Sequence, residues 1–114
     1  MSLKNTAIKN DSKMVRISFN MKVHSFCAIG KDHFTNNLQV EFTPGELIPD
    51  YTIVEKRIKE LEGQENNVEA VVAKVFDILM EVEPIYLRVE SYVEDAETHF
   101  PVRVEKATNF FQLG

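Results

Sequence analysis

The sequence predicts an α+β domain in which one four-stranded antiparallel sheet carries two helices on one face. Three observations predict it: two long segments alternate apolar and polar residues, two amphipathic segments of helical period follow, and two more alternating segments come last. Each helical segment has one apolar stripe and each strand has one apolar face. The simplest packing buries these surfaces against one another, in the order ββααββ.

The first two segments predict a pair of long strands joined by a short turn. From Val15 to Ile29 the odd positions are mostly apolar and the even positions mostly polar, which places Cys27 on the apolar face and His24 on the other. A turn is expected at residues 30–32. The second strand is expected from Phe34 to Thr43.

The middle of the chain predicts two helices. Residues 52–55 have the form of a capping box for the first helix, and Gly63 is a suitable stop for it. The second helix is expected to start after Asn66-Asn67, with Asn66 and Glu69 as its capping pair, and to end before Pro84.

The last two strands are expected over residues 85–93 and 100–105. Pro101 has no N–H to donate to a sheet, so it favours a strand at the edge. A sheet with free edges in a small protein favours assembly, and we expect a homo-oligomer.

Composition limits the classes of protein that the chain can belong to. With 114 residues, 44% of them hydrophobic, the sequence predicts one domain over residues 14–106, with a flexible N-terminal tail at 1–13 and a C-terminal tail at 107–114. The net charge of −5 without a basic cluster argues against nucleic-acid binding, and no apolar run reaches the ~20 residues that a membrane span needs. A single cysteine forms no internal disulfide, which favours a reducing, cytoplasmic location.

The layout resembles the tunnelling fold, and four segments are similar to motifs of the 6-pyruvoyl-tetrahydropterin synthase and 6-carboxytetrahydropterin synthase family. These segments are Phe26-Cys27-Ala28-Ile29-Gly30, Gly45 to Tyr51, Asn67-Val68-Glu69 and Val89 to Glu94. The resemblance implies subunits assembled into a β-barrel. It also implies a pterin, purine or deazapurine held at subunit interfaces by a glutamate, which would be Glu94.

The sequence departs from this family at the metal ligands. The family holds zinc with three histidines, but the first position is Gly30 here, the His-x-His of the second strand is missing, and only His33 lies nearby. The catalytic Asp-His segment between the helices is also absent, since residues 62–65 are too few to hold it. The resemblance therefore implies the ligand class more than zinc-dependent lyase chemistry.

A second resemblance is to the 7-cyano-7-deazaguanine reductase family, which has the same fold. It rests on Ser25-Phe26-Cys27 followed by Asp32-His33-Phe34. It implies that Cys27 is a nucleophile and that Glu69 is the ligand anchor. The family's NADPH-binding segment would fall on residues 50–53, which do not match it, and the amidine-forming members of this branch also lack that segment.

The residues themselves permit this chemistry and a plainer interpretation. A Cys27 thiolate adds readily to a nitrile or another activated carbon, and Asp32 or His33 nearby would manage the protons. The alternative is that Cys27 is buried and inert on the apolar face of its strand, as free cysteines commonly are.

Two further sets of side chains are candidates for binding. His24, His33 and His99 would make a three-histidine zinc site if the fold brought them together, although their spacing matches no strong metal motif. Glu69 or Glu94 would accept two parallel hydrogen bonds from the edge of a heterocycle. The alternatives are that Glu69 caps a helix and that Glu94 belongs to an exposed acidic turn.

Three functions therefore stay open at this stage. The first is a divergent 6-pyruvoyl-tetrahydropterin synthase-like protein that binds a small heterocycle at subunit interfaces, with or without zinc. The second is a cysteine-dependent enzyme of the nitrile-reductase-like or amidine-forming group. The third is an oligomeric protein of this fold without catalytic activity.

Overall fold

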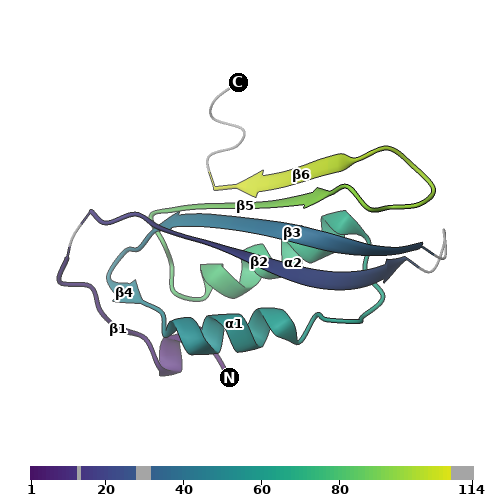
Figure 1. The fold of residues 1–114 in the computed structure, drawn as a ribbon. Helices are drawn as coiled ribbons and strands as arrows, with labels where there is room; N and C mark the ends of the chain where they lie inside the picture. The colour runs from purple at the N-terminus through teal and green to yellow at the C-terminus, as the bar shows by residue number, and fades with distance from the viewer. Residues whose placement is uncertain (13, 28–31, 109–114) are drawn as a thin grey trace.

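In the computed structural model, four strands form one antiparallel sheet in the order β2-β3-β5-β6, and both helices pack on the same face of it (Figure 1). The structure describes residues 1–12, 14–27 and 32–108. The main elements are β2 (Ile17–Cys27), β3 (Asp32–Thr43), α1 (Tyr51–Lys59), α2 (Val68–Met80), β5 (Tyr86–Val93) and β6 (Val102–Ala107). This is the α+β architecture that the order of periodic segments predicts.

The core lies between the sheet and the helices. The side chains of Leu38, Val40 and Phe42 on β3 are at most 1% exposed, and Val71 and Val75 of α2 are fully buried beneath the sheet. The three residues of β3 occupy every second position of the strand, and the two residues of α2 are one helical turn apart. The two apolar patterns in the sequence therefore correspond to the two faces that pack against each other.

The pairing of β2 with β3 determines which residues lie opposite each other at the two ends of this long hairpin. Ile17 is paired with Phe42 at one end, and Cys27 is paired with Asp32 at the other. The Cα atoms of directly opposite residues in an antiparallel pair lie about 4.5–5.5 Å apart. The strands therefore bring a thiol and a carboxylate side by side from positions that flank the turn.

Both helices begin at a side-chain cap, but not at the caps that we expected. Asp50 caps α1 by accepting the N–H of Thr52 at 2.9 Å, as its place at the positive end of the helix suggests, so the capping box at 52–55 was wrong. Asn67 caps α2 in place of Asn66. The physical reason is that the Asn66 N–H donates to the Phe26 carbonyl at 3.0 Å, which holds this residue beside β2.

The connection between the helices runs along one half of the outer edge of β2. The Gly63 N–H donates to the His24 carbonyl at 2.9 Å, and the Phe26 N–H donates to the Gln64 carbonyl at 3.2 Å. Gly63 reaches this position with a φ of 74°, which favours glycine. Among the described residues no strand pairs with the rest of that edge, over Ile17 to Lys22, or with the outer edge of β6. Pro101 directly precedes β6, which confirms the edge position that it suggested.

The N-terminal segment is packed, whereas we expected a flexible tail over residues 1–13. Leu3 is fully buried in the main core, in a short 3-10 helix (Leu3–Asn5). Its N–H donates to Glu81 at 2.8 Å. Beyond it, β1 (Ile8–Lys9) pairs with β4 (Leu47–Ile48). The segment is too short and too polar for an alternating pattern to reveal this packing.

At the other terminus, β6 runs to Ala107, and the Thr108 N–H still donates to the Leu87 carbonyl at 3.0 Å. The expected C-terminal tail at 107–114 therefore starts within the sheet, and its residues 109–114 lie outside the described residues, as does most of the expected turn at 30–32. No helix of the described residues is long and apolar enough to cross a membrane.

Candidate functional site

A pocket of about 300 Å³ opens where the β2–β3 hairpin ends, beside the start of α2 and the loop between β5 and β6. Figure 1 shows the hairpin end and this loop at the same end of the molecule. The polar residues that line the pocket are Cys27, Asp32, Asn67, Glu69, Thr98 and His99. Phe34, Val68, Phe100 and Val102 supply its apolar part. The volume is at the lower end of the range for small-molecule sites.

The position of Cys27 is compatible with both interpretations of its sequence context. It is a free, half-buried cysteine that packs against a small apolar cluster of Phe34, Val68 and Val93, and it also lines the pocket. Its helix-facing position on β2 explains both, because the strand ends here and the helices no longer cover it completely.

Asp32 is a buried carboxylate at the pocket wall. It is 6% exposed, and the Thr98 hydroxyl donates to its Oδ2 at 2.5 Å. A buried acid needs such partners, since burying an unpaired charge is costly. The hydrogen bond also fixes the orientation of the carboxyl group next to the cross-strand Cys27.

Glu69 lies in the first turn of α2 with its side chain exposed at the pocket. The capping task that the sequence suggested for it belongs to Asn67, whose Oδ1 accepts the Ala70 N–H at 2.8 Å. Within the described residues the Glu69 carboxylate has no hydrogen bond or ion pair. It is therefore available to a ligand.

The histidines do not gather at this pocket. His24 and His33 lie on the helix-free face of the sheet, with His24 Nε2 and His33 Nδ1 at 3.4 Å, whereas His99 lines the pocket. His33 points away from Asp32 because neighbouring residues of a strand face opposite sides. No group of three or more His, Cys, Asp or Glu side chains among the described residues is arranged to hold a metal ion, so the three-histidine site is not assembled.

Glu94 is not brought to the pocket either. It is exposed at the end of β5. The adjacent Asp95 accepts the Thr35 N–H at 2.9 Å, and this hydrogen bond lowers the pKa of the Asp95 carboxyl group.

Sequence reasoning missed the contribution of the loop between β5 and β6. Thr98 and Phe100 line the pocket, and Phe100, which we expected to begin the last strand, precedes β6 by two residues. The position of Pro101 was the available signal, because proline is common just before or at the start of an edge strand.

His99 lines the pocket without joining a zinc site. Its Nδ1 lies 2.7 Å from the Phe100 carbonyl oxygen. A carbonyl only accepts, so this contact assigns the proton of a neutral His99 to Nδ1 and leaves Nε2 as the acceptor.

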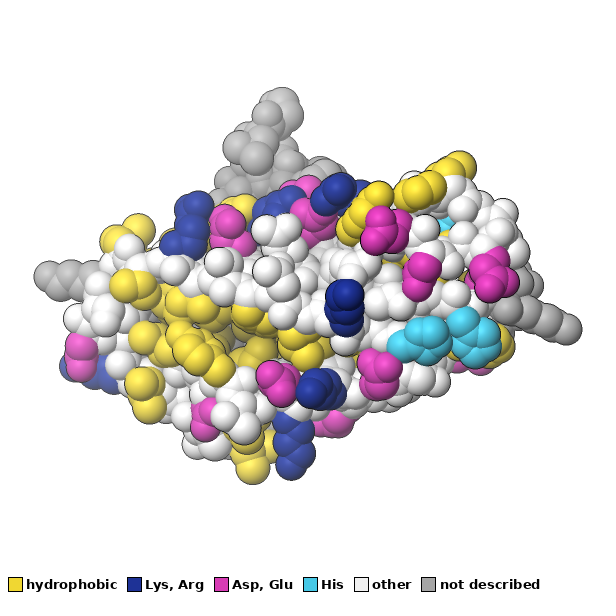
Figure 2. Space-filling model, viewed as in Figure 1, with side chains coloured by type: hydrophobic (Ala, Val, Ile, Leu, Met, Phe, Trp, Pro, Cys, Tyr) yellow, Lys and Arg dark blue, Asp and Glu magenta, His cyan; other side chains and the backbone are white. Residues whose placement is uncertain are grey.

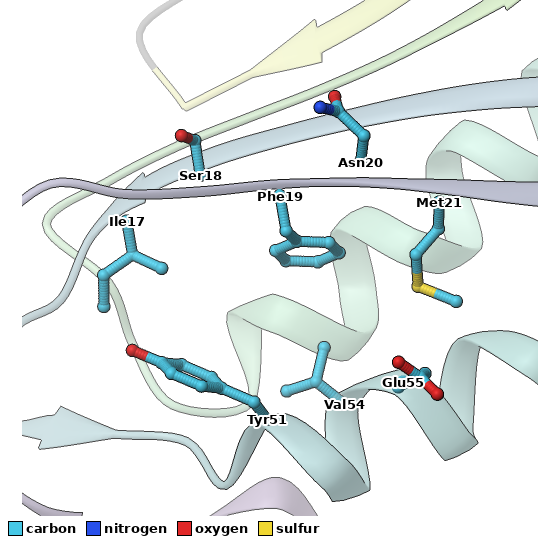
Figure 3. A pocket seen from close by; sticks show the side chains of 8 residues that line it. All are labelled: Ile17, Ser18, Phe19, Asn20, Met21, Tyr51, Val54 and Glu55. Atoms are coloured by element: carbon cyan, nitrogen blue, oxygen red, sulfur yellow. The ribbon is translucent and has the colours of Figure 1, made fainter.

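A second hollow lies between the open part of the β2 edge and α1. It measures about 210 Å³ and is visible as the apolar depression between the two elements in Figure 2. In Figure 3, Ile17, Phe19 and Met21 point from β2 toward α1, while Tyr51 and Val54 approach from the helix. We call this surface the β2–α1 groove. Most of its exposed lining area is apolar, and no cysteine or histidine among the described residues lines it.

A third hollow, of about 420 Å³, lies on the helix-free face around Glu90. The Glu90 side chain is 4% exposed and accepts hydrogen bonds from Arg88, at 2.6 Å, and from Arg103. Burial raises the pKa of Glu90, but the hydrogen bonds from Arg103 and Arg88 outweigh it and the pKa is lowered. Because this carboxylate already has Arg88 of the same strand and Arg103 of the neighbouring strand β6 as partners, it has a structural role in the sheet.

Comparison with known proteins identifies the fold. No protein-family model matches the sequence, and no curated protein is significantly similar to it. Among solved structures, an archaeosine synthase QueF-Like in the apo form superposes with a TM-score of 0.71 at 19% identity, covering 86% of this chain and 95% of the other. Dihydroneopterin aldolase from Burkholderia thailendensis bound to guanine superposes with a TM-score of 0.57 at 15% identity, covering 84% and 91%. The chain therefore has the tunnelling fold.

Proposed function

We propose that the protein binds a flat, purine-like heterocycle, such as guanine, a pterin or a deazapurine, in the pocket at the end of the β2–β3 hairpin. One observation carries the proposal: Cys27 and Asp32, which flank the β2–β3 turn, and Glu69 of α2, which is distant from them in the sequence, line the same pocket. The two structural neighbours support the ligand class, since one is described as an archaeosine synthase and the other as bound to guanine.

Glu69 is the anchor in this proposal. A carboxylate with both oxygens free accepts two parallel hydrogen bonds from the ring N–H and the amino group of a guanine-like edge. The pairing requires both groups on one edge, so it selects guanine-like rings over adenine-like rings. Glu94, the other candidate, is exposed outside the pocket and has no comparable support.

Cys27 is the nucleophile for a ligand that carries an electrophilic carbon. With a nitrile, Cys27 gives its thiol proton to the Asp32 carboxylate, the sulfur forms a bond to the nitrile carbon, one π bond of the C≡N group breaks, and the nitrogen takes a proton, which gives a thioimidate. The cross-strand Asp32, oriented by Thr98, is placed to deliver that proton. The step needs a reduced thiol, which agrees with a cytoplasmic location.

This arrangement favours the cysteine-dependent alternative over zinc-dependent chemistry of the 6-pyruvoyl-tetrahydropterin synthase type. The latter needs three histidines together, and the described histidines are divided between two faces of the sheet. A protein of this fold without catalysis would bind the ring and form no adduct.

Glu69→Gln is expected to weaken binding of guanine and 7-cyano-7-deazaguanine by about 10- to 100-fold, because it replaces one of the two acceptor oxygens by an NH2 donor and removes the charge from the remaining hydrogen bond. Isothermal titration calorimetry measures the effect. Asp77→Asn is the matched control, since it removes a carboxylate from an exposed position of the same helix outside the pocket. Equal affinity of Glu69→Gln and the unchanged protein would contradict the anchor role.

We further propose a homo-oligomer in which the β2–α1 groove and the adjoining open edge of β2 are covered by another copy. Tyr51 is 58% exposed at this groove. Tyr51→Glu should therefore reduce the particle size measured by light scattering, because it places a charge in a contact that excludes water. Tyr51→Phe keeps the ring and should assemble normally. A particle of only 13.1 kDa for the unchanged protein at micromolar concentration would rule out this assembly.

A further inference from the structure

The loop between β5 and β6, residues 94–101, is held against the pocket at two points. Near its start, Asp95 Oδ1 accepts the N–H of Thr35 on β3 at 2.9 Å. Near its end, the Thr98 hydroxyl donates to Asp32 at 2.5 Å. Both partners belong to the β2–β3 hairpin, so the loop has a defined position over the end of the sheet.

This fixed loop presents an uncovered aromatic ring at the pocket. Phe100 lines the pocket, yet it is 74% exposed. The described residues offer it one ring contact, with His99 at 5.8 Å between centroids and 65° between planes. Burial of a phenylalanine side chain is favourable, so the exposed Phe100 offers apolar surface that a ligand in the pocket can cover.

We propose that Phe100 stacks on the bound heterocycle and makes the pocket selective for flat bicyclic rings over single-ring ligands. The proposal rests on the proposed function, because it concerns the ligand of the same pocket. Glu69 contributes hydrogen bonds in the plane of the ring, and Phe100 contributes contact with its face. The two interactions come from different elements, α2 and the β5–β6 loop. The first depends on the hydrogen-bonding groups at the ligand's edge, and the second depends on the area of its ring face.

The size of the ring matters because stacking energy follows the area of contact. Stacking of a nucleobase on an aromatic side chain is worth about 1–3 kcal/mol by alanine substitution, which corresponds to about 5- to 150-fold in affinity. A single ring offers less area to Phe100 than a fused pair of rings. Cytosine is therefore expected to bind less tightly than guanine, and to lose less on removal of the Phe100 ring.

The experiment measures guanine and cytosine affinities by calorimetry for the full chain, Phe100→Ala and Phe100→Tyr. We expect Phe100→Ala to weaken guanine binding by about 5- to 150-fold and to lower the ratio of guanine to cytosine affinity. Phe100→Tyr, which keeps the ring, should stay within about threefold of the unchanged protein. Ile85→Ala is the control, because Ile85 is also exposed, at 60%, and does not line the pocket. Thermal unfolding checks that each variant is folded.

The outcomes separate this inference from the proposed function. If the unchanged protein binds neither guanine nor 7-cyano-7-deazaguanine, the proposed function fails and the stacking role fails with it. If the protein binds guanine and Glu69→Gln weakens it, but Phe100→Ala binds as tightly as the unchanged protein, the stacking role alone is overturned. The stacking role is also overturned if Phe100→Ala changes only the sedimentation of the protein, since Phe100 would then cover a contact between copies.

Discussion

Cys27→Ala is expected to eliminate the covalent adduct between the protein and 7-cyano-7-deazaguanine and to leave reversible binding of this ligand within about threefold. The adduct needs a sulfur nucleophile, and Cys27 is the single cysteine of the chain. Reversible binding depends on other groups, chiefly the free carboxylate of Glu69. Intact-protein mass spectrometry measures the first quantity, as a mass increase of one ligand, and calorimetry measures the second.

Asp32→Asn provides the companion measurement to Cys27→Ala. An amide does not deliver the proton that the nitrile nitrogen needs, so the adduct should form about 100-fold or more slowly while its final structure is unchanged. Thr98 would still donate to the side-chain oxygen, which preserves the orientation of the group. An undiminished adduct in Cys27→Ala would remove the cysteine from the mechanism. Reversible binding without any adduct in the unchanged protein would assign the pocket to recognition alone.

The fold was predictable because its signals are local and periodic. Val40 and Val71 belong to an alternating strand and to a stripe of helical spacing, and each pattern indicates one buried face without knowledge of the partner. Four strands and two helices with one apolar face each allow few arrangements in a chain of this length. The confirmed sheet and helix layer follow from that restriction.

The candidate site was predictable only where strand geometry fixes it. Cys27 and Asp32 meet because the hairpin pairs residues at equal distances from its turn, and His33 is excluded because it points to the other face. The approach of Glu69 depends on where α2 begins, which is set by a backbone hydrogen bond between Asn66 and Phe26. Thr98 reaches Asp32 through the folding of a loop, and no sequence period reports such a contact.

The N-terminal segment makes a stabilising contact that the sequence pattern also did not reveal. Leu3 is one apolar residue in a polar stretch, so a flexible tail was the natural prediction, yet it is fully buried in the main core. Its N–H donates to Glu81, which is itself held by two hydrogen bonds from Arg57 at 2.9 Å. These hydrogen bonds from Arg57 lower the pKa of Glu81, so the anchor of the segment stays charged at neutral pH.

Leu3→Ala is therefore expected to lower the free energy of unfolding by about 2–5 kcal/mol, the range for truncating a fully buried leucine. The loss combines the transfer free energy of the removed carbons with the cavity that they leave among the residues of the main core. Urea unfolding followed by circular dichroism measures it. Ile8→Ala is the matched control, because Ile8 belongs to the same segment but is 64% exposed, and its truncation should cost less than about 0.5 kcal/mol. If residues 1–13 were a detached tail, the two variants would be equally stable. If the segment is packed, Leu3→Ala should unfold at a lower urea concentration than Ile8→Ala, with the same dependence of the unfolding free energy on urea concentration.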